Sequence, residues 1–286
     1  MKANLNCIHC LQEQAFHATH LIEGSKELQE QVLRQVMQRL LGLSWALTPI
    51  ELAQQVHLTV RTITQHDDPY RTVKKASNDF VLQFYPTLTS MTVQSLDPLL
   101  TAIKLMIAGN IIDYGAFRTV NIQQTIHDVL EKQLAIDDYR TFKSQIKQAN
   151  TLLFFTDNAG EIVFDKLFLE TLLNKKRFQQ ITVVVKGGAM INDATLDDVQ
   201  YIGLDKLPNI QFKTLSNGEQ GTGPMITSSE IRQWIRSYDL IIVKGQGNYE
   251  GLSDVHDVFF ALIAKCPVVA SDLGVHIRDI VFKYNT

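Results

Sequence analysis

The chain has 286 residues, of which 45 % are hydrophobic, enough for one large domain or two modest domains with a buried core. Its 27 basic and 30 acidic residues give a net charge of −3 without a basic stripe, so we expect no nucleic-acid partner and no membrane partner. The N-terminal segment lacks the apolar core of a signal peptide, no stretch is long enough to span a bilayer, and three cysteines are too few for a disulfide framework. We therefore predict a cytoplasmic protein.

Residues 1–149 show the spacing of amphipathic helices. Apolar residues recur every three or four positions over 29–41, which predicts a helix with one buried face. Thr48, Pro49 and Glu51 form a helix start, with an N-cap, a proline in the first turn and a glutamate three residues after the cap. Further helices are expected over 68–84, ended by Pro86, over 96–108 and over 122–134. Because no convincing strand is visible, we predict an all-helical N-terminal domain over residues 1–149 that lines the substrate cleft.

From Thr151 onward the pattern changes to short apolar runs separated by helical stretches. We predict strands over residues 152–155, 181–185, 210–215, 240–243 and 267–270. Apolar and β-branched runs that alternate with helices are typical of a parallel sheet covered on both faces, with right-handed crossovers. Residues 150–286 are therefore predicted to form a Rossmann-like three-layer α/β/α domain with a mostly parallel sheet, which places the chain in the α/β class.

Polar loops that contain glycine follow the first four predicted strands, at residues 156–161, 186–193, 216–223 and 244–250. Open α/β sheets bind ligands outside the carboxyl ends of their strands, so these loops define the expected active site. Asp157 and Asn158 are adjacent in the first loop, and Asp193 lies in the second. Two carboxylates and an amide form an all-oxygen set that suits Mg²⁺ or Mn²⁺, with Co²⁺ or Ni²⁺ as alternatives. No cysteine or histidine accompanies these loops, which disfavours zinc.

The same loops carry groups suited to a phosphate. Gly160 allows a tight turn at the start of a helix predicted over 161–173, whose free N–H groups and dipole attract an anion. Lys186 and Lys244 each stand at a strand end before a glycine, where a phosphate can approach the ammonium group. The combination predicts metal-assisted hydrolysis of a phosphate ester, in which Asp157 is either a metal ligand only or also the base or nucleophile.

Six segments together carry a family resemblance. In chain order they are NCIHC (6–10), DPYRTVKKASN (68–78), AGNIIDYG (108–115), TDNAGEIVFD (156–165), VKGGAMINDAT (185–195) and VKGQGNYE (243–250). They resemble the DUF89 family, the damage-control phosphatases with an ARMT1-like domain, and their order matches the order in that family. The Cys-x-x-Cys start resembles the shorter, mainly prokaryotic branch.

The resemblance implies a helical N-terminal part packed on a Rossmann-like domain, and metal-dependent hydrolysis of small phosphorylated metabolites in metabolite damage control. It places the metal on Asp157, Asn158 and Asp193, and a phosphate contact on Lys244. The residues expected to bind the substrate or its phosphate are Gly160, Glu161, Lys186, Asn248, Glu250, Asp68, Lys74, Asn78, Asn110 and Asp113.

The residues in the helical half have simpler interpretations as well. The helical spacing of Asp68, Lys74 and Asn78 is compatible with a capped, solvated helix, whereas the family resemblance favours a helix that borders the pocket. Asn110 and Asp113 stand beside glycines and either terminate a helix or line the same cleft.

The cysteines have three alternative roles. Cys7 and Cys10 are either structural thiols, part of an accessory metal site, or a redox pair. Cys266 precedes the strand predicted over 267–270, so we expect it at the sheet edge opposite the active loops.

Two other functions compete with the phosphatase. A Rossmann-like nucleotide- or methyl-donor-binding enzyme normally has a glycine-rich first turn, whereas the first turn here is Asp-Asn-Ala-Gly. A non-catalytic metal-binding module is the third hypothesis. The sequence leaves open the identity of the phosphorylated metabolite and the oligomeric state.

Overall fold

Helices dominate the first half of the chain in the computed structural model, which describes residues 1–109 and 122–286. They are α1 (Leu5–Leu21), α2 (Lys26–Gly42), α3 (Pro49–Thr64), α4 (Arg71–Gln94), α5 (Pro98–Ala108), α6 (Ile122–Glu131) and α7 (Tyr139–Ile146). The start of α3 has the predicted capping box, in which Thr48 Oγ1 accepts from the Glu51 N–H and Glu51 Oε2 accepts from the Thr48 N–H. None of the helices within the described ranges is both long enough and apolar enough to cross a membrane.

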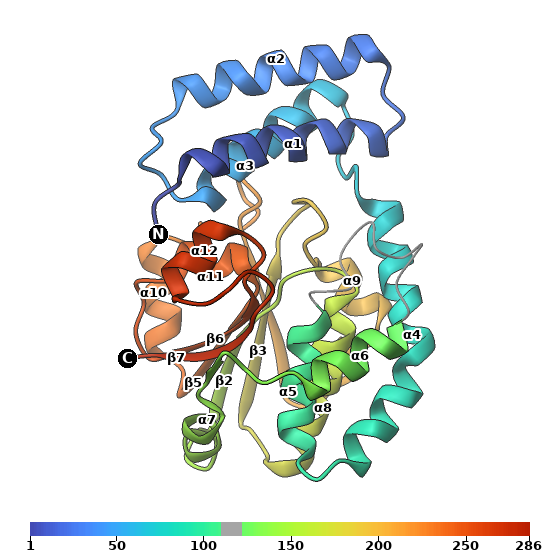
Figure 1. Cartoon of the computed structure of the whole chain (residues 1–286), viewed down its shortest axis with the longest axis vertical. Coiled ribbons are helices and arrows are strands. Elements are labelled where there is room, and N and C mark those ends of the chain that lie inside the picture. Colours follow the sequence, from blue (N-terminus) through green and yellow to red (C-terminus); the bar gives the residue numbers. More distant parts are fainter. Residues whose placement is uncertain (110–121) are drawn as a thin grey trace.

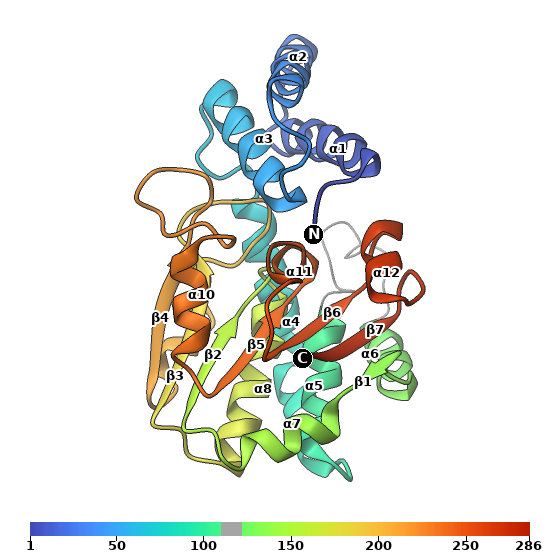
Figure 2. The ribbon, with the colours of Figure 1, turned by 90° about the vertical axis from the view of Figure 1, so that its left-hand side faces the viewer.

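A seven-stranded sheet forms the centre of the molecule, with the strand order β1-β7-β6-β5-β2-β3-β4 (Figures 1 and 2). The strands are β1 (Ile136–Asp137), β2 (Thr151–Phe155), β3 (Gln180–Lys186), β4 (Ile210–Leu215), β5 (Leu240–Lys244), β6 (Val258–Ile263) and β7 (Ile280–Asn285). Neighbouring strands are parallel except for β6 and β7. The predicted α/β class with a mostly parallel sheet is therefore confirmed.

The remaining helices follow individual strands and complete the layers. They are α8 (Glu161–Lys175), α9 (Leu196–Tyr201), α10 (Ser229–Arg236), α11 (Gln246–Leu252) and α12 (Pro267–Leu273).

Alternate residues of β2 enter different cores, because successive side chains of a strand point to opposite faces of the sheet. Leu152 and Phe154 lie in the core that also contains α4, α5 and α8, whereas Leu153 and Phe155 lie in the core shared with α1–α3 and α10–α12. Helices therefore cover both faces of the sheet.

The first of these cores joins residues from both sides of position 149. Ile103 of α5 and Phe164 of α8 belong to the same buried cluster as the β2 residues. The second core likewise contains residues from both sides of position 149, and its helices α1–α3 form a layer next to the carboxyl ends of the strands (Figure 2). The division of the chain into domains at 149/150 stays a prediction.

Four details of the sequence-based expectation were wrong. Pro86 does not end its helix, because α4 continues through it to Gln94. The short strand β1 lies in the half that was expected to contain no strand. The run 267–270 is the start of α12, with Pro267 in the first turn after the N-cap Cys266. The actual last strands are β6 and β7, which were not predicted.

Candidate active site

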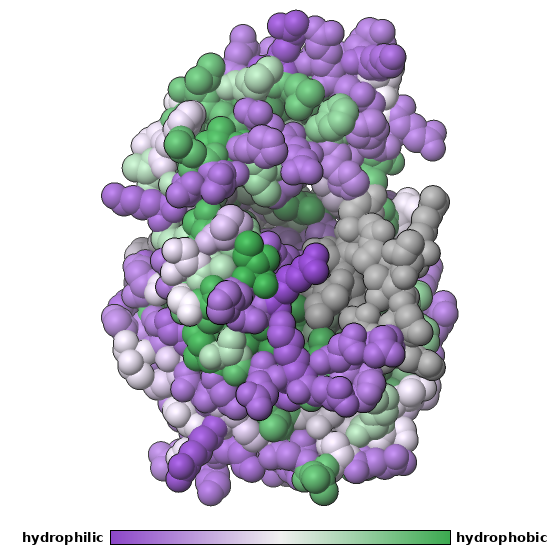
Figure 3. Space-filling view, viewed as in Figure 1, coloured by the Kyte–Doolittle hydropathy of each residue, from purple (hydrophilic) through white to green (hydrophobic). Residues whose placement is uncertain are grey.

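The carboxyl ends of β2, β3 and β5 open into a cavity of about 470 Å³, which α1 and α3 line from the other side. The recess between the α1–α3 layer and the rest of the molecule is visible in the space-filling view (Figure 3). Phe155 of β2 pairs with both Val184 of β3 and Val243 of β5, so the loops after these strands start at the same level. Six of the expected site residues line the cavity: Asp157, Asn158, Lys186, Asp193, Asn248 and Glu250.

Backbone hydrogen bonds hold the first two loops against each other. The Ala194 N–H donates to the Asp157 carbonyl oxygen, and the Ala159 N–H donates to the Asn192 carbonyl oxygen, each at 2.9 Å. These two bonds form a short antiparallel bridge between Asn158 and Asp193. The three residues expected to bind the metal are thereby placed together at one wall of the cavity.

The two carboxylates at this wall are in an unfavourable environment for negative charge. Burial raises the pKa of Asp157 well above its usual value, and the carboxylates of Glu161 and Asp193 raise it further, while Lys265 and Lys244 act in the opposite sense. Burial also raises the pKa of Asp193, although Lys186 Nζ lies 3.5 Å from its Oδ2 and favours the ionised form. Oxygen donors with an excess of partly buried negative charge suit a hard divalent cation.

Lys244 lies beneath the cavity rather than on its wall. Its ammonium group is 2.7 Å from Asp165 Oδ1 and 3.1 Å from Glu161 Oε2, and its side chain is 1 % exposed. Burial lowers the pKa of Lys244, but the carboxylates of Asp165 and Glu161 outweigh burial and leave the pKa raised. Burial raises the pKa of Asp165 to about 7 despite this ion pair. The contact of Lys244 with a substrate phosphate stays a prediction.

Glu161 links this buried ion pair to the cavity wall. Asn158 Nδ2 donates to Glu161 Oε1 at 2.7 Å and to Asp157 Oδ2 at 3.1 Å. Lys244 therefore fixes Glu161, which in turn fixes the orientation of the Asn158 amide. Since Nδ2 is used as a donor inside the protein, Asn158 has its Oδ1 atom left as the group suited to bind a cation.

The first turn of α8 is bonded within the protein. Gly160 has a φ of +82°, which favours glycine, and its N–H donates to Asn78 Oδ1 at 2.6 Å. Asn78 Nδ2 donates in turn to Asp198 Oδ1 at 2.9 Å. Gly160 is not among the residues that line the cavity. The N–H expected to attract an anion is thus already paired with α4.

The α4 residues expected near the pocket are buried, so the alternative of a solvated helix face was wrong. Lys74 Nζ lies 3.0 Å from Asp198 Oδ2 and 3.6 Å from Asp68 Oδ2, and it donates to Thr195 Oγ1. Asn78 is 1 % exposed. These residues join α4 to the segment that follows Asp193, and Tyr70 at the start of α4 lines the cavity. Lys74 and Asn78 therefore hold the segment that follows Asp193 in place without lining the cavity themselves.

Asn248 and Glu250 lie on α11. Asn248 Nδ2 donates to the carbonyl oxygens of Thr156 at 2.8 Å and Lys244 at 2.7 Å, which ties together the ends of β2 and β5. Burial raises the pKa of Glu250 to about 7, although Gln246 Nε2 donates to its Oε1 at 3.0 Å. Asn110 and Asp113 lie outside the described residues.

Sequence reasoning missed Lys265 and misplaced Cys266. Both line the cavity, because the segment 264–266 follows β6 at the same edge of the sheet as the other loops. The prediction that Cys266 lies at the opposite edge was wrong. The sequence feature that could have revealed their true position is the run VFFALI at 258–263, because its continuous apolar residues indicate a buried strand just before Lys265.

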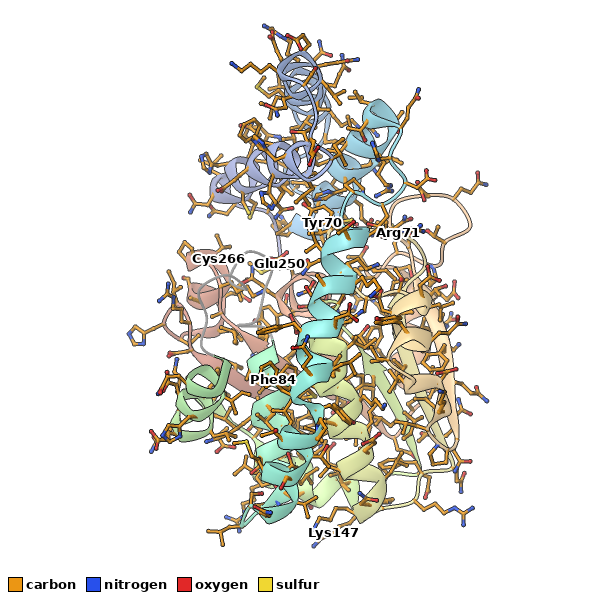
Figure 4. All side chains as sticks on the ribbon, turned by 90° about the vertical axis from the view of Figure 1, so that its right-hand side faces the viewer. Tyr70, Arg71, Phe84, Lys147, Glu250 and Cys266 are labelled. Carbon is orange, nitrogen blue, oxygen red and sulfur yellow. The ribbon has the colours of Figure 1, made fainter. Side chains whose placement is uncertain are left out.

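All three cysteines face this cavity. Cys7, Cys10 and Cys266 line it, and Gln246 Nε2 donates to both Cys266 Sγ and Glu250 Oε1. Figure 4 shows Glu250 and Cys266 near each other, with Tyr70 at the start of α4. Burial raises the pKa of Cys7 and of Cys10, so both thiols are protonated at neutral pH. Within residues 1–109 and 122–286 no group of three or more His, Cys, Asp or Glu side chains is arranged to hold a metal ion.

Comparison with known proteins gives matches over almost the full chain. The sequence model of the damage-control phosphatase ARMT1-like domain matches residues 3–281. A damage-control phosphatase of Archaeoglobus fulgidus is 32 % identical, covering 99 % of this chain and 99 % of its own length. An uncharacterised protein of Methanocaldococcus jannaschii is also 32 % identical, covering 98 % of this chain and 94 % of its own length. The crystal structure of a DUF89 family protein from Pyrococcus horikoshii has a TM-score of 0.84 at 26 % identity, with 100 % of both chains covered.

Fold and site together define a Rossmann-like α/β protein with an acidic cavity at the carboxyl ends of its strands. The chain belongs to the damage-control phosphatase ARMT1-like family, also called DUF89. The family resemblance read from the six sequence segments is thereby confirmed, and with it the assignment to the phosphatases. The nucleotide- or methyl-donor-binding alternative receives no support from these matches.

Proposed function

We propose that this phosphatase hydrolyses monoesters of small phosphorylated metabolites with the help of one divalent metal ion, held by Asp157, Asn158 and Asp193. The observation that carries the proposal is the pair of half-buried carboxylates with raised pKa values beside an amide whose donor is already used. Such a set has an excess of oxygen donors and of negative charge, and both are relieved by a bound cation. Bound there, Mg²⁺ or Mn²⁺ supplies Lewis-acid polarisation of a phosphoryl oxygen.

The protein groups around this set are suited to hold a phosphate ester. Lys186, beside Asp193, contributes positive charge at the wall. Asn248 joins the end of β2, which leads to Asp157 and Asn158, to the end of β5. Residues of α1 and α3 form the opposite wall of the cavity, which limits access of bulk water. The substrate therefore lies between the sheet loops and the α1–α3 layer.

The test is hydrolysis of p-nitrophenyl phosphate by protein stripped with EDTA, after Mg²⁺, Mn²⁺, Co²⁺ or Ni²⁺ is added back singly. We expect turnover only with added metal, and a loss of about 100-fold or more in Asp157→Asn and in Asp193→Asn. Asp205→Asn, which changes an exposed acid away from the cavity, serves as the matched control and should retain full activity. Equal turnover in EDTA, or full activity of Asp193→Asn, would overturn the proposal.

A further inference from the structure

Part of the cavity is lined by apolar side chains that come from distant segments of the chain. They belong to α1, to α3 and to the loop between β3 and α9, and they are Leu11, Ile50, Ala53, Met190 and Ile191. The first four are buried members of one hydrophobic core, and Ile191 packs against that core. These five side chains form the apolar patch of the cavity, where the core itself reaches the space open to a ligand.

The apolar patch lies next to the carboxylates of the proposed metal site. The Asp193 N–H donates to the Met190 carbonyl oxygen at 3.0 Å, so Met190 lies in the same turn as that acid. Ile50 Cδ1 lies 3.6 Å from the Cβ position of Gly247 in α11, and the N-cap backbone of that helix lies against the Asp157 carboxylate. A group esterified to a phosphate at these carboxylates would therefore contact the apolar patch.

Ile191 has a backbone conformation that suits other residues better. Its φ is +47°, in the left-handed region, where glycine or asparagine is favoured and a β-branched residue is an outlier. Strain of this kind is concentrated at functional sites, where the surrounding structure imposes it. Ile191 is half-buried, lines the cavity and precedes Asp193 by two residues. The strain indicates that an apolar side chain at this position has a use in the cavity.

The amide of Gln14 lines the cavity one turn after Leu11, but it is used within the protein. Burial and the nearby Arg61 lower the pKa of His57 to about 3, so His57 is neutral at neutral pH. Its Nε2 lies 3.1 Å from Gln14 Oε1 and donates to it, while Gln14 Nε2 donates to Cys10 Sγ at 3.4 Å. A hydroxyl group placed on the apolar patch would lose hydrogen bonds to water without gaining one from this amide, whereas an apolar group would gain by burial.

We propose that the substrates are phosphomonoesters with an apolar leaving group, an aliphatic chain or an aromatic ring, that lies on the apolar patch. The inference rests on the proposed function, because it takes the loops with Asp157 and Asp193 as the phosphate end. The cavity of about 470 Å³ is within the range of small-molecule sites, roughly 300–1,000 Å³, and has room for such a group beside the phosphate. Hydrolysis of the P–O bond by water releases the apolar alcohol and inorganic phosphate.

The test is a series of alkyl phosphates that differ in chain length alone. Ethyl, butyl and hexyl phosphate have leaving groups of nearly equal basicity, so differences in kcat/KM report the contacts of the chain. For Mn²⁺-loaded wild type we expect kcat/KM to rise about two- to fourfold with each added methylene. Butyl phosphate should exceed the more polar glycerol 3-phosphate by about tenfold or more. A flat series, or a preference for glycerol 3-phosphate, overturns the inference.

The apolar patch is tested by Ile191→Asn. Asparagine tolerates a positive φ, so the variant should retain the fold while it loses the apolar side chain. We expect the ratio of kcat/KM for hexyl phosphate to that for ethyl phosphate to fall about threefold or more, mainly through a higher KM for hexyl phosphate. Ile277→Asn is the matched control, because Ile277 is exposed and does not line the cavity, and its ratio should equal that of wild type. An unchanged ratio in Ile191→Asn overturns the role of the patch.

Failure of this inference is distinguishable from failure of the proposed function. Metal-dependent turnover of p-nitrophenyl phosphate together with a flat alkyl series overturns the inference alone. If p-nitrophenyl phosphate is the only ester hydrolysed, ethylphosphonate and hexylphosphonate are compared as competitive inhibitors. If no ester is hydrolysed, the proposed function fails, and calorimetric titration of the two phosphonates into Mn²⁺-loaded protein decides. Tighter binding of hexylphosphonate by about tenfold or more supports the apolar patch as the binding surface, and equal affinity overturns it.

Discussion

The backbone of Gly245 lies directly against the carboxylate of Asp157, although the two residues follow different strands. A Cβ atom at position 245 would overlap the Asp157 side chain, and the φ of +82° at Gly245 is also unfavourable for any other residue. The close approach of β5 thus fixes the position of the acid in the loop after β2.

Gly245→Ala is therefore expected to displace the Asp157 carboxylate. We expect kcat/KM to fall about 100-fold and the free energy of unfolding to fall by about 2–4 kcal/mol, measured by phosphatase assay and urea titration. Gly221→Ala is the matched control, because Gly221 has a φ of +83° but open space around the position of a Cβ. Equal losses of activity in both variants would show that backbone strain, rather than contact with Asp157, is responsible.

Asp157→Asn should lower the phosphatase activity without lowering the stability of the metal-free protein. Because burial and the nearby Glu161 and Asp193 raise the pKa of Asp157, its ionised form destabilises the metal-free fold at neutral pH. We expect the EDTA-treated variant to unfold at the same temperature as wild type or higher, while Mn²⁺ raises the Tm of wild type only. Differential scanning calorimetry with and without Mn²⁺ checks this. A variant that still gains stability from Mn²⁺ would contradict the assignment of the ligand.

Lys244 stabilises the fold through the two acids it pairs with. Lys244→Met leaves Asp165 and Glu161 buried without their cation and should lower the free energy of unfolding by about 3–5 kcal/mol. The double variant Lys244→Met/Asp165→Asn should lose less than the single variant, since one of the uncompensated charges is removed with its partner. Lys175→Met, at the exposed end of α8, is the control and should change stability by less than about 0.5 kcal/mol.

Asn78 joins α4 to the start of α8 and to α9. Its side chain accepts from the Gly160 N–H and donates to Asp198, and it is buried. Asn78→Ala leaves both partners unsatisfied and should cost about 2–3 kcal/mol of unfolding free energy in urea titrations. Thr72→Ala, at an exposed position of the same helix, should have little effect. A similar loss in both variants would argue against a specific role for the Asn78 amide.

Glu250 should make stability depend on pH. Burial raises the pKa of this carboxyl from 4.5 to about 7, so the unfolded chain releases the proton at lower pH than the folded protein. The wild type therefore loses stability as the pH rises through this window, and Glu250→Gln removes the loss. The variant should be more stable by about 1–3 kcal/mol above pH 7 and nearly equal to wild type near pH 4.5. A difference that does not change with pH in guanidinium titrations would contradict this.

The sequence by itself determined the parallel sheet and the edge of the sheet at which the candidate site lies. Apolar runs such as 152–155 and 181–185 are local signals, and the polar loops that follow them must meet because parallel strands end at the same edge. Asp157, Asn158 and Asp193 were placed together on that argument, and the structure brings them to one wall of the cavity. The capping box at Thr48 is likewise a local pattern and was predicted correctly.

Only the tertiary structure decided where each polar side chain of that edge points. Lys186 and Lys244 occupy equivalent places in the sequence, yet the first lines the cavity and the second lies below it, because Asp165 and Glu161 of α8 provide a buried partner for its charge. The apolar run after Cys266 has strand propensity, but the N-cap cysteine and Pro267 start a helix there. Propensity and periodicity act over a few residues, whereas the burial of a charge and the choice between helix and strand depend on partners that are distant in the chain.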